Sequence, residues 1–311
     1  MNYIVFDLEW NQAPTVEEAR PGLPFEIIEI GAVKVSAETL QTLDMFHRII
    51  EPVVYPELFS HTRQVVALNQ KDLEAGDSFH EAATDFLSWC GAGGEEYLFA
   101  TWGSGDLKEL QRNLEYFHIR NPFTGPIKYA DVQQLYAISE NETNQSLSLE
   151  SVAQKMRISW QGRYHAALSD ARYTAEILKT LDPELIETYP ALDTYHYPDE
   201  KNEGLMLSYP DHLILYSPSF KTREELENSH TSILRCPVCK KKSKRLIPWH
   251  SGNGRAYYTI ARCQTHGPMR GRRVFHDPEE DIHYTTITIK QITEEEAEHI
   301  VGKIRERGRR S

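Results

Sequence analysis

Two carboxylates stand in an otherwise apolar run near the amino terminus, NYIVFDLEWN, which covers residues 2–11. Asp7 and Glu9 are separated by a single leucine, and in a β-strand residues two apart point to the same face. Like charges about 4 Å apart repel each other by about 4 kcal/mol at an effective dielectric of about 20. Unless they are solvated or paired with arginine at a sheet edge, the two acids need a cation, and hard divalent ions with oxygen ligands suit that role.

The composition is that of a globular protein. With 311 residues, of which 40% are hydrophobic and 26% charged, the chain is long enough for one large domain and a smaller one. It has no apolar stretch of about 20 residues, and its amino terminus lacks the basic-then-apolar pattern of a signal peptide. We therefore expect a soluble, cytoplasmic protein with reduced cysteines and no membrane partner.

Charge is distributed unevenly along the chain. The formal net charge is −12, yet residues 235–273 contain eleven Lys and Arg and no Asp or Glu. The remainder therefore carries −12 minus 11, or −23. Two electrostatically different parts are joined in one chain.

The first 181 residues alternate between strand-like and helix-like patterns. Three β-rich runs, at 3–10, 26–36 and 45–53, predict an antiparallel meander. The patterns that follow predict strands at 97–102 and 127–132, and helices at 78–90, 106–117, 148–156 and 165–181. This order indicates an α/β fold in which helices flank a mixed sheet.

The rest of the chain divides into two further parts. Residues 182–230 contain several prolines and predict a linker with some β structure. Residues 231–311 predict a small β-rich module that ends in a helix at 293–310, whose acidic residues come first and basic residues last, as the helix dipole favours.

Further candidate site residues lie in the first part. Asp106 follows a predicted strand and a glycine-containing turn, and His165 precedes Asp170 by five residues at the start of a predicted helix. Taken singly, Asp106 is explained as a helix cap, and His165 or Asp170 as a structural residue. Small side chains would let this last helix lie close against the sheet, at Ala166, Ala167 and Ala171.

In order and local context these residues resemble the motifs of the DEDDh branch of the DEDD (DnaQ-like) exonucleases. The family's D-x-E strand is matched by Asp7 and Glu9, its second Asp by Asp106, and its H-x4-D motif by His165 and Asp170. The runs EIIEIGAVKV and HRIIEPVVYP are similar to the family's second and third strands, and TWGSGD and DLEWN resemble the Eri and sporulation-inhibitor type. The resemblance covers residues 1–181 and implies a ribonuclease H-like fold.

The resemblance also implies a mechanism. Asp7, Glu9 and Asp170 would hold one Mg²⁺ or Mn²⁺, and Asp7 and Asp106 would hold a second. His165 would take a proton from the attacking water. The chain is then expected to be a 3′-to-5′ exonuclease that releases nucleoside 5′-monophosphates from single-stranded nucleic acid with a free 3′ end, RNA being favoured over DNA. The alternatives are an adaptor that binds nucleic acid without cutting it, and an exonuclease of DNA proofreading or repair.

One departure from the family pattern follows the D-x-E pair. Many members have Thr there, whereas this chain has Trp10 and Asn11. Trp10 is expected either to stack on a base or to pack in the core. Three other acids are kept out of the expected site because capping or surface roles suffice for them, namely Glu29, Asp72 and Asp131.

Four ligand-type residues in the last part follow metal-binding spacing. Cys236-x2-Cys239 and Cys263-x2-His266 are separated by a β-like span, and they resemble the two knuckles of a zinc ribbon with one structural Zn²⁺. A redox C-x-x-C pair, or unrelated thiols and imidazoles, are the alternatives. Cys90 lies in an apolar helical pattern and is expected to be a buried small hydrophobe.

Basic residues surround these knuckles, with Trp249, Tyr257 and Tyr258 between them. This combination suits a phosphate backbone and base stacking, and docking to an acidic protein surface is the alternative. The residues expected to contact nucleic acid are Lys240, Lys241, Lys242, Lys244 and Arg245. The sequence identifies neither a protein partner nor an oligomeric state.

Overall fold

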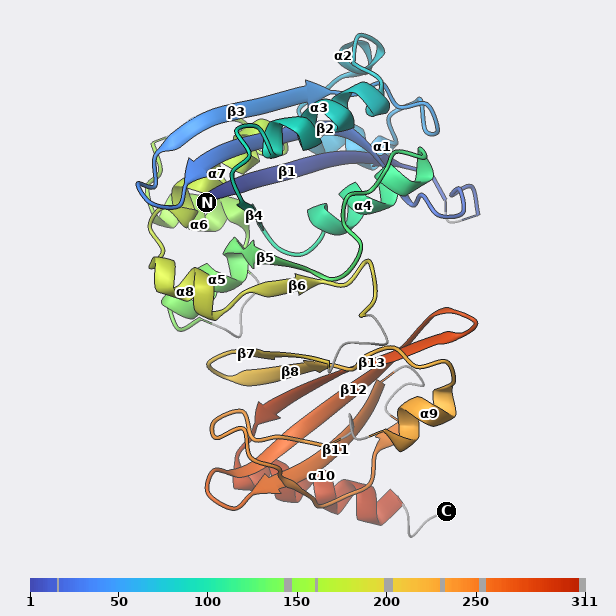
Figure 1. Cartoon of the computed structure of the whole chain (residues 1–311), viewed down its shortest axis with the longest axis vertical. Coiled ribbons are helices and arrows are strands. Elements are labelled where there is room, and N and C mark those ends of the chain that lie inside the picture. The colour runs from blue at the N-terminus through green and yellow to red at the C-terminus, as the bar shows by residue number, and fades with distance from the viewer. Residues whose placement is uncertain are drawn as a thin grey trace. The chain divides into compact units, whose positions relative to one another are not determined.

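The computed structural model divides the chain into two compact units, Met1–His196 and Tyr197–Ser311 (Figure 1). The described residues are 1–15, 17–142, 147–159, 162–198, 204–229, 233–251 and 256–307, with side chains described up to residue 302. Each unit has its own sheet and its own hydrophobic core.

The first unit is a mixed sheet flanked by helices (Figure 1). Its strands are β1 (Asn2–Gln12), β2 (Phe25–Ser36), β3 (Thr42–Ile49), β4 (Tyr97–Thr101), β5 (Ile127–Asp131) and β6 (Ala191–Asp193). The strand order is β3-β2-β1-β4-β5-β6, in which β1 pairs antiparallel with β2 and parallel with β4. The predicted antiparallel meander and mixed sheet are confirmed.

Helices pack on both faces of this sheet. They are α1 (Ser60–Val65), α2 (Gln70–Glu74), α3 (Phe79–Cys90), α4 (Asp106–Tyr116), α5 (Val132–Ser139), α6 (Leu149–Lys155), α7 (Ala167–Leu178) and α8 (Pro183–Thr188). The four helices predicted in this unit correspond to α3, α4, α6 and α7, and Ser78 caps α3 with a capping box. None of the helices that the structure describes combines the length and the apolar character that crossing a bilayer requires.

The two faces of β1 carry different residues because successive side chains alternate. Tyr3 and Val5 are buried in one core cluster together with residues of α7. Phe6 and Leu8 are buried in another cluster with residues of α3 and α4. Asp7 and Glu9 continue the face of Tyr3 and Val5, so both acids lie on the face that α7 covers.

A glycine lets α7 lie directly against the sheet. Gly31 of β2 is the register partner of Asp7, and a Cβ atom at Gly31 would lie 2.0 Å from the backbone nitrogen of Leu168. On the helix side Ala167 and Ala171 are fully buried. The predicted close packing through small side chains is confirmed, and Gly31 is its counterpart on the sheet.

The loop that follows β3 is held by two buried polar side chains. The Glu26 carboxylate accepts hydrogen bonds from the backbone N–H groups of residues 53–55, at 2.6–3.1 Å. The Asn11 side chain donates to the carbonyl oxygens of Tyr55 and Glu57, both at 2.8 Å, and accepts from the Phe59 N–H at 3.0 Å. The end of β1 is therefore tied to the residue that precedes α1.

The second unit is an antiparallel sheet in the order β10-β11-β12-β13-β8-β7, with β9 paired to β11. Its strands are β7 (Leu205–Ser208), β8 (His212–Tyr216), β9 (Lys244–Arg245), β10 (His250–Ser251), β11 (Ala256–Cys263), β12 (Gly267–Glu279) and β13 (Ile282–Gln291). Its helices are α9 (Arg223–Asn228) and α10 (Glu294–Arg307). The predicted tail helix is α10, and residues 308–310 lie outside the described residues.

The stretch 182–230, for which we expected a linker with some β structure, contains α8, β6, β7, β8 and α9. β6 extends the first sheet by pairing with β5. β7 and β8 pair with each other, and β8 also pairs with β13. Each sheet therefore takes strands from this stretch.

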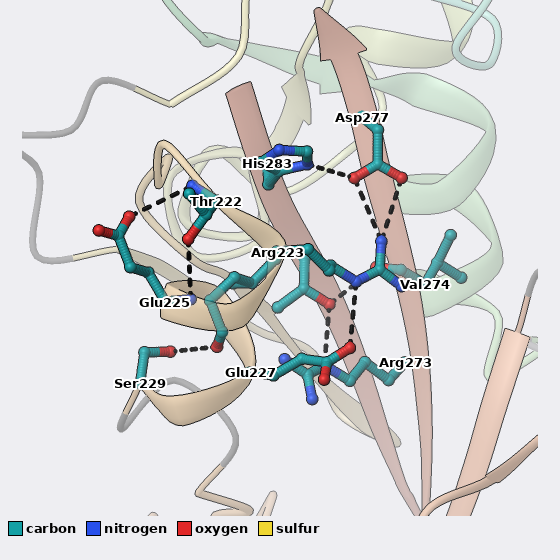
Figure 2. Close-up of polar contacts among 11 residues, drawn as sticks. Thr222, Arg223, Glu225, Glu227, Ser229, Arg273, Val274, Asp277 and His283 are labelled. Carbon is teal, nitrogen blue, oxygen red and sulfur yellow. Dashed lines mark hydrogen bonds and ion pairs between the residues drawn. The ribbon is translucent and has the colours of Figure 1, made fainter. Parts of the chain in front are cut away.

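Arg223 fastens α9 to the second sheet (Figure 2). Its guanidinium donates twice to the Asp277 carboxylate, at 3.0 and 3.1 Å, and once to Glu227 at 3.2 Å. Asp277 also pairs with His283 at 2.6 Å. Both hydrogen bonds to Asp277 come from the same guanidinium nitrogen, Nη1, and they link the short helix to β12.

Replacing Gly31 by Ala tests the contact of α7 with the sheet. We expect the free energy of unfolding to fall by about 1–3 kcal/mol, the usual cost of overpacking, because a backbone atom of α7 must move away from the new methyl group. Urea denaturation followed by circular dichroism measures this change. The matched control is Gly91→Ala, whose Cβ meets no described atom within 4 Å and should change stability by less than about 0.5 kcal/mol. Equal urea midpoints for the two variants would contradict the close packing.

Candidate active site

The D-x-E strand and the start of α7 meet at one point. One ligand atom each of Glu9, His165 and Asp170 lie within 4.8 Å of one another. Asp7 and Asp106 are outside this group of three, but the Asp7 carboxyl interacts electrostatically with Asp106, Glu9 and Asp170. The fold therefore brings the five predicted residues into one neighbourhood from β1, α4, α7 and the segment that leads into α7, which carries His165.

Asp106 is held against β1. It is the first residue of α4, and its carboxylate accepts a hydrogen bond from the Leu8 N–H at 3.1 Å. This N–H lies beyond the paired part of β1 and β4, which ends at Val5 and Ala100. The N-cap position of α4 is Gly105, so the simple capping explanation of Asp106 is wrong. Its buried carboxylate instead reaches the backbone between Asp7 and Glu9.

The backbone of His165 is fixed from both sides. Its N–H donates to the Asp170 carboxylate at 3.0 Å, and its carbonyl oxygen accepts from the Ala67 N–H at 2.8 Å. His165 has a φ of 59°, a left-handed conformation that costs energy in a non-glycine residue and persists where surrounding contacts hold it. Its side chain remains exposed, so the imidazole is accessible beside two carboxylates.

The acids of the site are hard to ionise together. Burial first, and then the carboxylates of Asp106 and Glu9, raises the pKa of Asp7 well above its usual range. Burial, followed by the charge of Asp170, raises the pKa of Glu9 to about 8. Burial raises the pKa of Asp106 to about 7 and that of Asp170 to about 6, against the hydrogen bonds that both receive. A bound cation would remove this repulsion.

The donor set fits a hard divalent cation. The four acids supply oxygen ligands, and within the described chain no Lys or Arg forms an ion pair with them. The Oδ1 atom of Asp170 is buried and has no hydrogen-bond partner among the described residues. A metal ion with oxygen ligands would supply the partner that this buried carboxylate oxygen, beside Glu9, needs.

Glu29 is a fifth acid at this site. It is the register partner of Glu9 on β2, it is 2% exposed, and its charge raises the pKa of Glu9 after burial and Asp170. One carboxylate oxygen pairs with His47 at 2.7 Å, and the other is buried without a described partner. The expected surface or capping role of Glu29 is therefore wrong. Its position in a strand two residues before Gly31 is the signal that could have indicated burial.

The other two acids kept out of the site cap helices, as expected, although the charge of Asp131 also raises the pKa of Asp106 after burial. Asp72 completes the capping box of α2 with Asn69, and Asp131 caps α5 by accepting from the Gln134 N–H at 3.1 Å. Trp10 is half-buried, and its ring lies 5.5 Å from that of Phe25, which agrees with the packing alternative. Base stacking by Trp10 remains a prediction.

The second unit brings its four ligand-type residues together. Cys236 Sγ lies 3.5 Å from His266 Nδ1, Cys239 Sγ lies 3.7 Å from Cys263 Sγ, and Cys263 Sγ lies 3.7 Å from His266 Nδ1. In a tetrahedral zinc site, with Zn–S distances of about 2.3 Å and Zn–N of about 2.0–2.1 Å, neighbouring ligand atoms lie about 3.5–3.8 Å apart. The spacing fits such a site.

Two of these thiols have different environments. Burial raises the pKa of the Cys236 thiol above its usual range. Hydrogen bonds from the backbone N–H groups of His266 and Thr265 lower the pKa of Cys263 to about 6. A thiolate is the form that binds metal. Cys90 is buried in the first unit, where burial raises the pKa of its thiol to about 12, as expected for a structural cysteine.

The basic residues near the knuckles differ in their accessibility. Lys241, Lys242, Lys244 and Arg245 are exposed. Lys240 is half-buried, and its ammonium donates to the Ser208 hydroxyl and the Pro237 carbonyl. The ammonium of Lys240 is thus engaged within the unit, whereas the other four side chains face solvent.

Comparison with protein families gives a match over this first unit. The family described as Exonuclease (RNase_T) matches residues 4–178, which is more than half of the chain. The chain is similar to the probable 3′-5′ exonuclease KapD of Bacillus subtilis (strain 168), with 26% identity over 162 residues. That alignment covers 51% of this chain and 74% of KapD.

Similar proteins are also found in animals. Human ERI1 exoribonuclease 3 is 24% identical over 173 residues, which cover 51% of this chain and 48% of the human protein. The chain therefore spans about half the length of this relative. The solved nuclease domain of 3′hExo, a DEDDh family member bound to rAMP, is 22% identical, covers 57% of this chain and 90% of its own, and has a TM-score of 0.49.

The raised pKa values predict how the metal-free protein responds to pH. Folding raises the pKa of Glu9 from 4.5 to about 8, so between these values the folded protein binds a proton more tightly than the unfolded chain does. Stability is then lost as the pH rises from about 5 to about 8. We expect Glu9→Gln to increase the free energy of unfolding by about 1–3 kcal/mol at pH 8, and by less at pH 5, in EDTA.

Thermal unfolding at both pH values measures this effect, with Glu38→Gln as the control because Glu38 is exposed. Addition of Mg²⁺ to the unchanged protein should raise its melting temperature, since a ligand of the folded state stabilises it. The same pH dependence in both variants would show that Glu9 is not under electrostatic strain.

Proposed function

The chain belongs to the exonuclease family, and on this basis we propose that it is a metal-dependent 3′-to-5′ exonuclease that acts on single-stranded RNA with a free 3′ end. The main support for this proposal is that one ligand atom each of Glu9, His165 and Asp170 lie within 4.8 Å of one another. Asp7 and Asp106 complete the set, so all five residues of the family motif are present in one neighbourhood. A protein that binds nucleic acid without cutting it would not need all five of these residues.

Each acid has a proposed role. Asp7, Glu9 and Asp170 would hold one Mg²⁺ or Mn²⁺, and Asp7 and Asp106 would hold a second. When bound, such a pair of ions stabilises the attacking and leaving oxygens of an in-line displacement. The unpartnered Asp170 Oδ1 supports this assignment because a buried carboxylate oxygen requires a partner.

His165 is the proposed general base. Its backbone is fixed by the hydrogen bonds to Asp170 and Ala67, while its imidazole stays accessible to water. An imidazole exchanges protons near neutral pH, so it can accept the proton of the attacking water. The product would be a nucleoside 5′-monophosphate released from the 3′ end.

The name of the human relative supports RNA as the substrate, and that of KapD supports the 3′-to-5′ direction. The human relative is named an exoribonuclease, and KapD is named a probable 3′-5′ exonuclease. We place the chain in the Eri-type branch, and we assign the exonuclease domain to residues 1–181. An exonuclease of DNA proofreading or repair would use the same chemistry, and the assay below distinguishes it by substrate.

We assign the second part, residues 231–311, to a zinc-ribbon-like module that holds one structural Zn²⁺ and captures nucleic acid. Support for zinc comes from the spacing of the four ligand atoms. Support for capture comes from charge, because the unit Tyr197–Ser311 has 20 Lys and Arg against 16 Asp and Glu, or +4. The unit Met1–His196 has 14 against 30, or −16, and would repel a polyanion at long range.

The test of the activity uses end-labelled single-stranded RNA and DNA of equal sequence, with Mg²⁺, Mn²⁺ or EDTA, read as product ladders. We expect shortening from the 3′ end, faster for RNA and absent in EDTA. Asp7→Asn and Asp170→Asn should abolish cleavage without unfolding the protein, since each removes one proposed ligand. Near-normal turnover of either variant in Mg²⁺ would refute the metal assignment.

Replacement of His165 by Ala should lower the cleavage rate by about 10²- to 10⁴-fold, the usual contribution of acid–base catalysis. Binding of RNA should persist. The rates of the variant and of the unchanged protein should be compared between about pH 5.5 and 9, because loss of a general base changes the pH profile. An unchanged rate and pH profile would assign the proton transfer to another group.

The zinc module is tested in the full-length chain. Metal analysis should find one zinc per chain, and Cys236→Ser should release it and lower the stability of the unit. The double change Lys241→Gln and Lys242→Gln should weaken RNA binding and flatten the dependence of log K on log salt by about 0.7 for each phosphate that is no longer bound. The control is Lys221→Gln, an exposed lysine outside the basic run. An unchanged salt slope would leave docking to a protein as the role of these lysines.

A further inference from the structure

A groove lined by three cationic side chains lies beside the proposed active site. Its volume is about 540 Å³, within the range of about 300–1,000 Å³ that ligand sites occupy. Arg63 comes from α1, Lys71 from α2, and Arg163 from the segment that leads to His165. The remaining lining residues are neutral, namely Val66, Ala67, Leu68, Asn69 and Gln70. Three separate segments thus contribute one positive charge each to the same groove.

Hydrogen bonds tie this groove to the site. Ala67, in the wall of the groove, donates its N–H to the carbonyl oxygen of His165 at 2.8 Å. Arg163 is two residues before His165. At the other end, the Phe59 N–H donates to Asn11, two residues after Glu9 on β1, and Phe59 is the N-cap of α1. The groove and the carboxylates are therefore held in one framework of the first unit.

The side chains of Arg63, Lys71 and Arg163 are available to bind an anion. In the described part of the chain, neither Lys71 nor Arg163 has a carboxylate partner, and both side chains are exposed. The Arg63 guanidinium donates to the Leu58 carbonyl oxygen at 3.2 Å, which orients it and leaves its charge unneutralised. None of the described residues that line the groove is acidic, although the unit as a whole carries −16. Three basic side chains that form no ion pair with a described residue gather here in an acidic unit, and this favours an anionic ligand.

We propose that this groove binds backbone phosphates of the RNA strand on the 5′ side of the bond that is cut. This inference rests on the proposed exonuclease function and specifies how its site takes hold of the strand. Only the 3′-terminal phosphodiester enters the carboxylate cluster, so the rest of the strand must leave along a neighbouring surface. Arg63 and Arg163 can each bind a phosphate with two parallel hydrogen bonds, and Lys71 adds a point charge. The positive charge of the groove thereby offsets, at this place, the repulsion between the acidic unit and the RNA.

The test compares two substrates that differ in the part the groove would hold. One is a 12-nucleotide single-stranded RNA, and the other is the p-nitrophenyl ester of uridine 5′-monophosphate, which has no upstream phosphate. The variants are Arg63→Gln, Lys71→Gln and Arg163→Gln. Arg120→Gln and Lys128→Gln are the controls, because both residues are exposed in the same unit and do not line the groove.

We expect each groove variant to raise KM for the 12-nucleotide RNA about 3- to 10-fold, with kcat changed less than about 2-fold and with ester hydrolysis unchanged. Binding of a fluorescent 12-nucleotide RNA in EDTA should weaken by a similar factor. Its slope of log K against log salt should fall by about 0.7 for each phosphate that the variant no longer binds. The control variants should match the unchanged protein in all three measurements.

Three results would overturn the proposal. In the first, the groove variants bind and cut RNA as the control variants do. In the second, the groove variants lose ester hydrolysis as much as RNA cleavage. In the third, a poly-glutamate peptide of equal charge competes with RNA for the groove. The binding measurement needs no catalysis, so it tests the groove even if the unchanged protein cuts neither substrate. Failure of the unchanged protein to cut either substrate would instead refute the proposed function.

Discussion

The repulsion among carboxylates buried on one face of the first sheet is the constraint on which this site depends. Asp7 and Glu9 share a face because β1 is regular from Asp7 to Glu9, and Asp106, Asp170 and Glu29 approach them from other elements. Burial and mutual repulsion raise the pKa values of the first four acids. Such an arrangement is stable in its ionised form only with a cation, which is why an acidic cluster here indicates metal chemistry.

The surrounding fold makes this unfavourable arrangement possible. Gly31 gives α7 room to lie on the sheet, and α7 carries Asp170 to within 4.8 Å of Glu9. The left-handed backbone of His165 is held by contacts to Asp170 and Ala67. Buried polar side chains such as Asn11 fix the loops around the site by satisfying several backbone groups at once. Packing and hydrogen bonds elsewhere in the unit thus offset the electrostatic cost of the site.

Charge is organised at two levels. The two units differ in sign, with −16 for Met1–His196 and +4 for Tyr197–Ser311, and long-range attraction of a nucleic acid favours the second. Within the acidic unit, three basic side chains gather at the groove beside His165, namely Arg63, Lys71 and Arg163. Screening at physiological salt acts over about 8 Å, so a strand held in that groove responds to the nearby bases more than to the charge of the whole unit.

Local patterns and spacing in the amino-acid sequence were enough to predict the features that neighbouring residues set. Strand alternation placed Asp7 and Glu9 on one face, the H-x4-D spacing placed His165 and Asp170 at the start of one helix, and the paired knuckles predicted the group Cys236, Cys239, Cys263 and His266. Which residues from distant segments meet became known from the folded structure. Glu29 faces the site through its pairing with Glu9, the Lys240 ammonium is bound inside its unit, and Gly31 contacts a helix more than 130 residues away. These contacts depend on strand register and on helix placement, which a linear pattern does not encode.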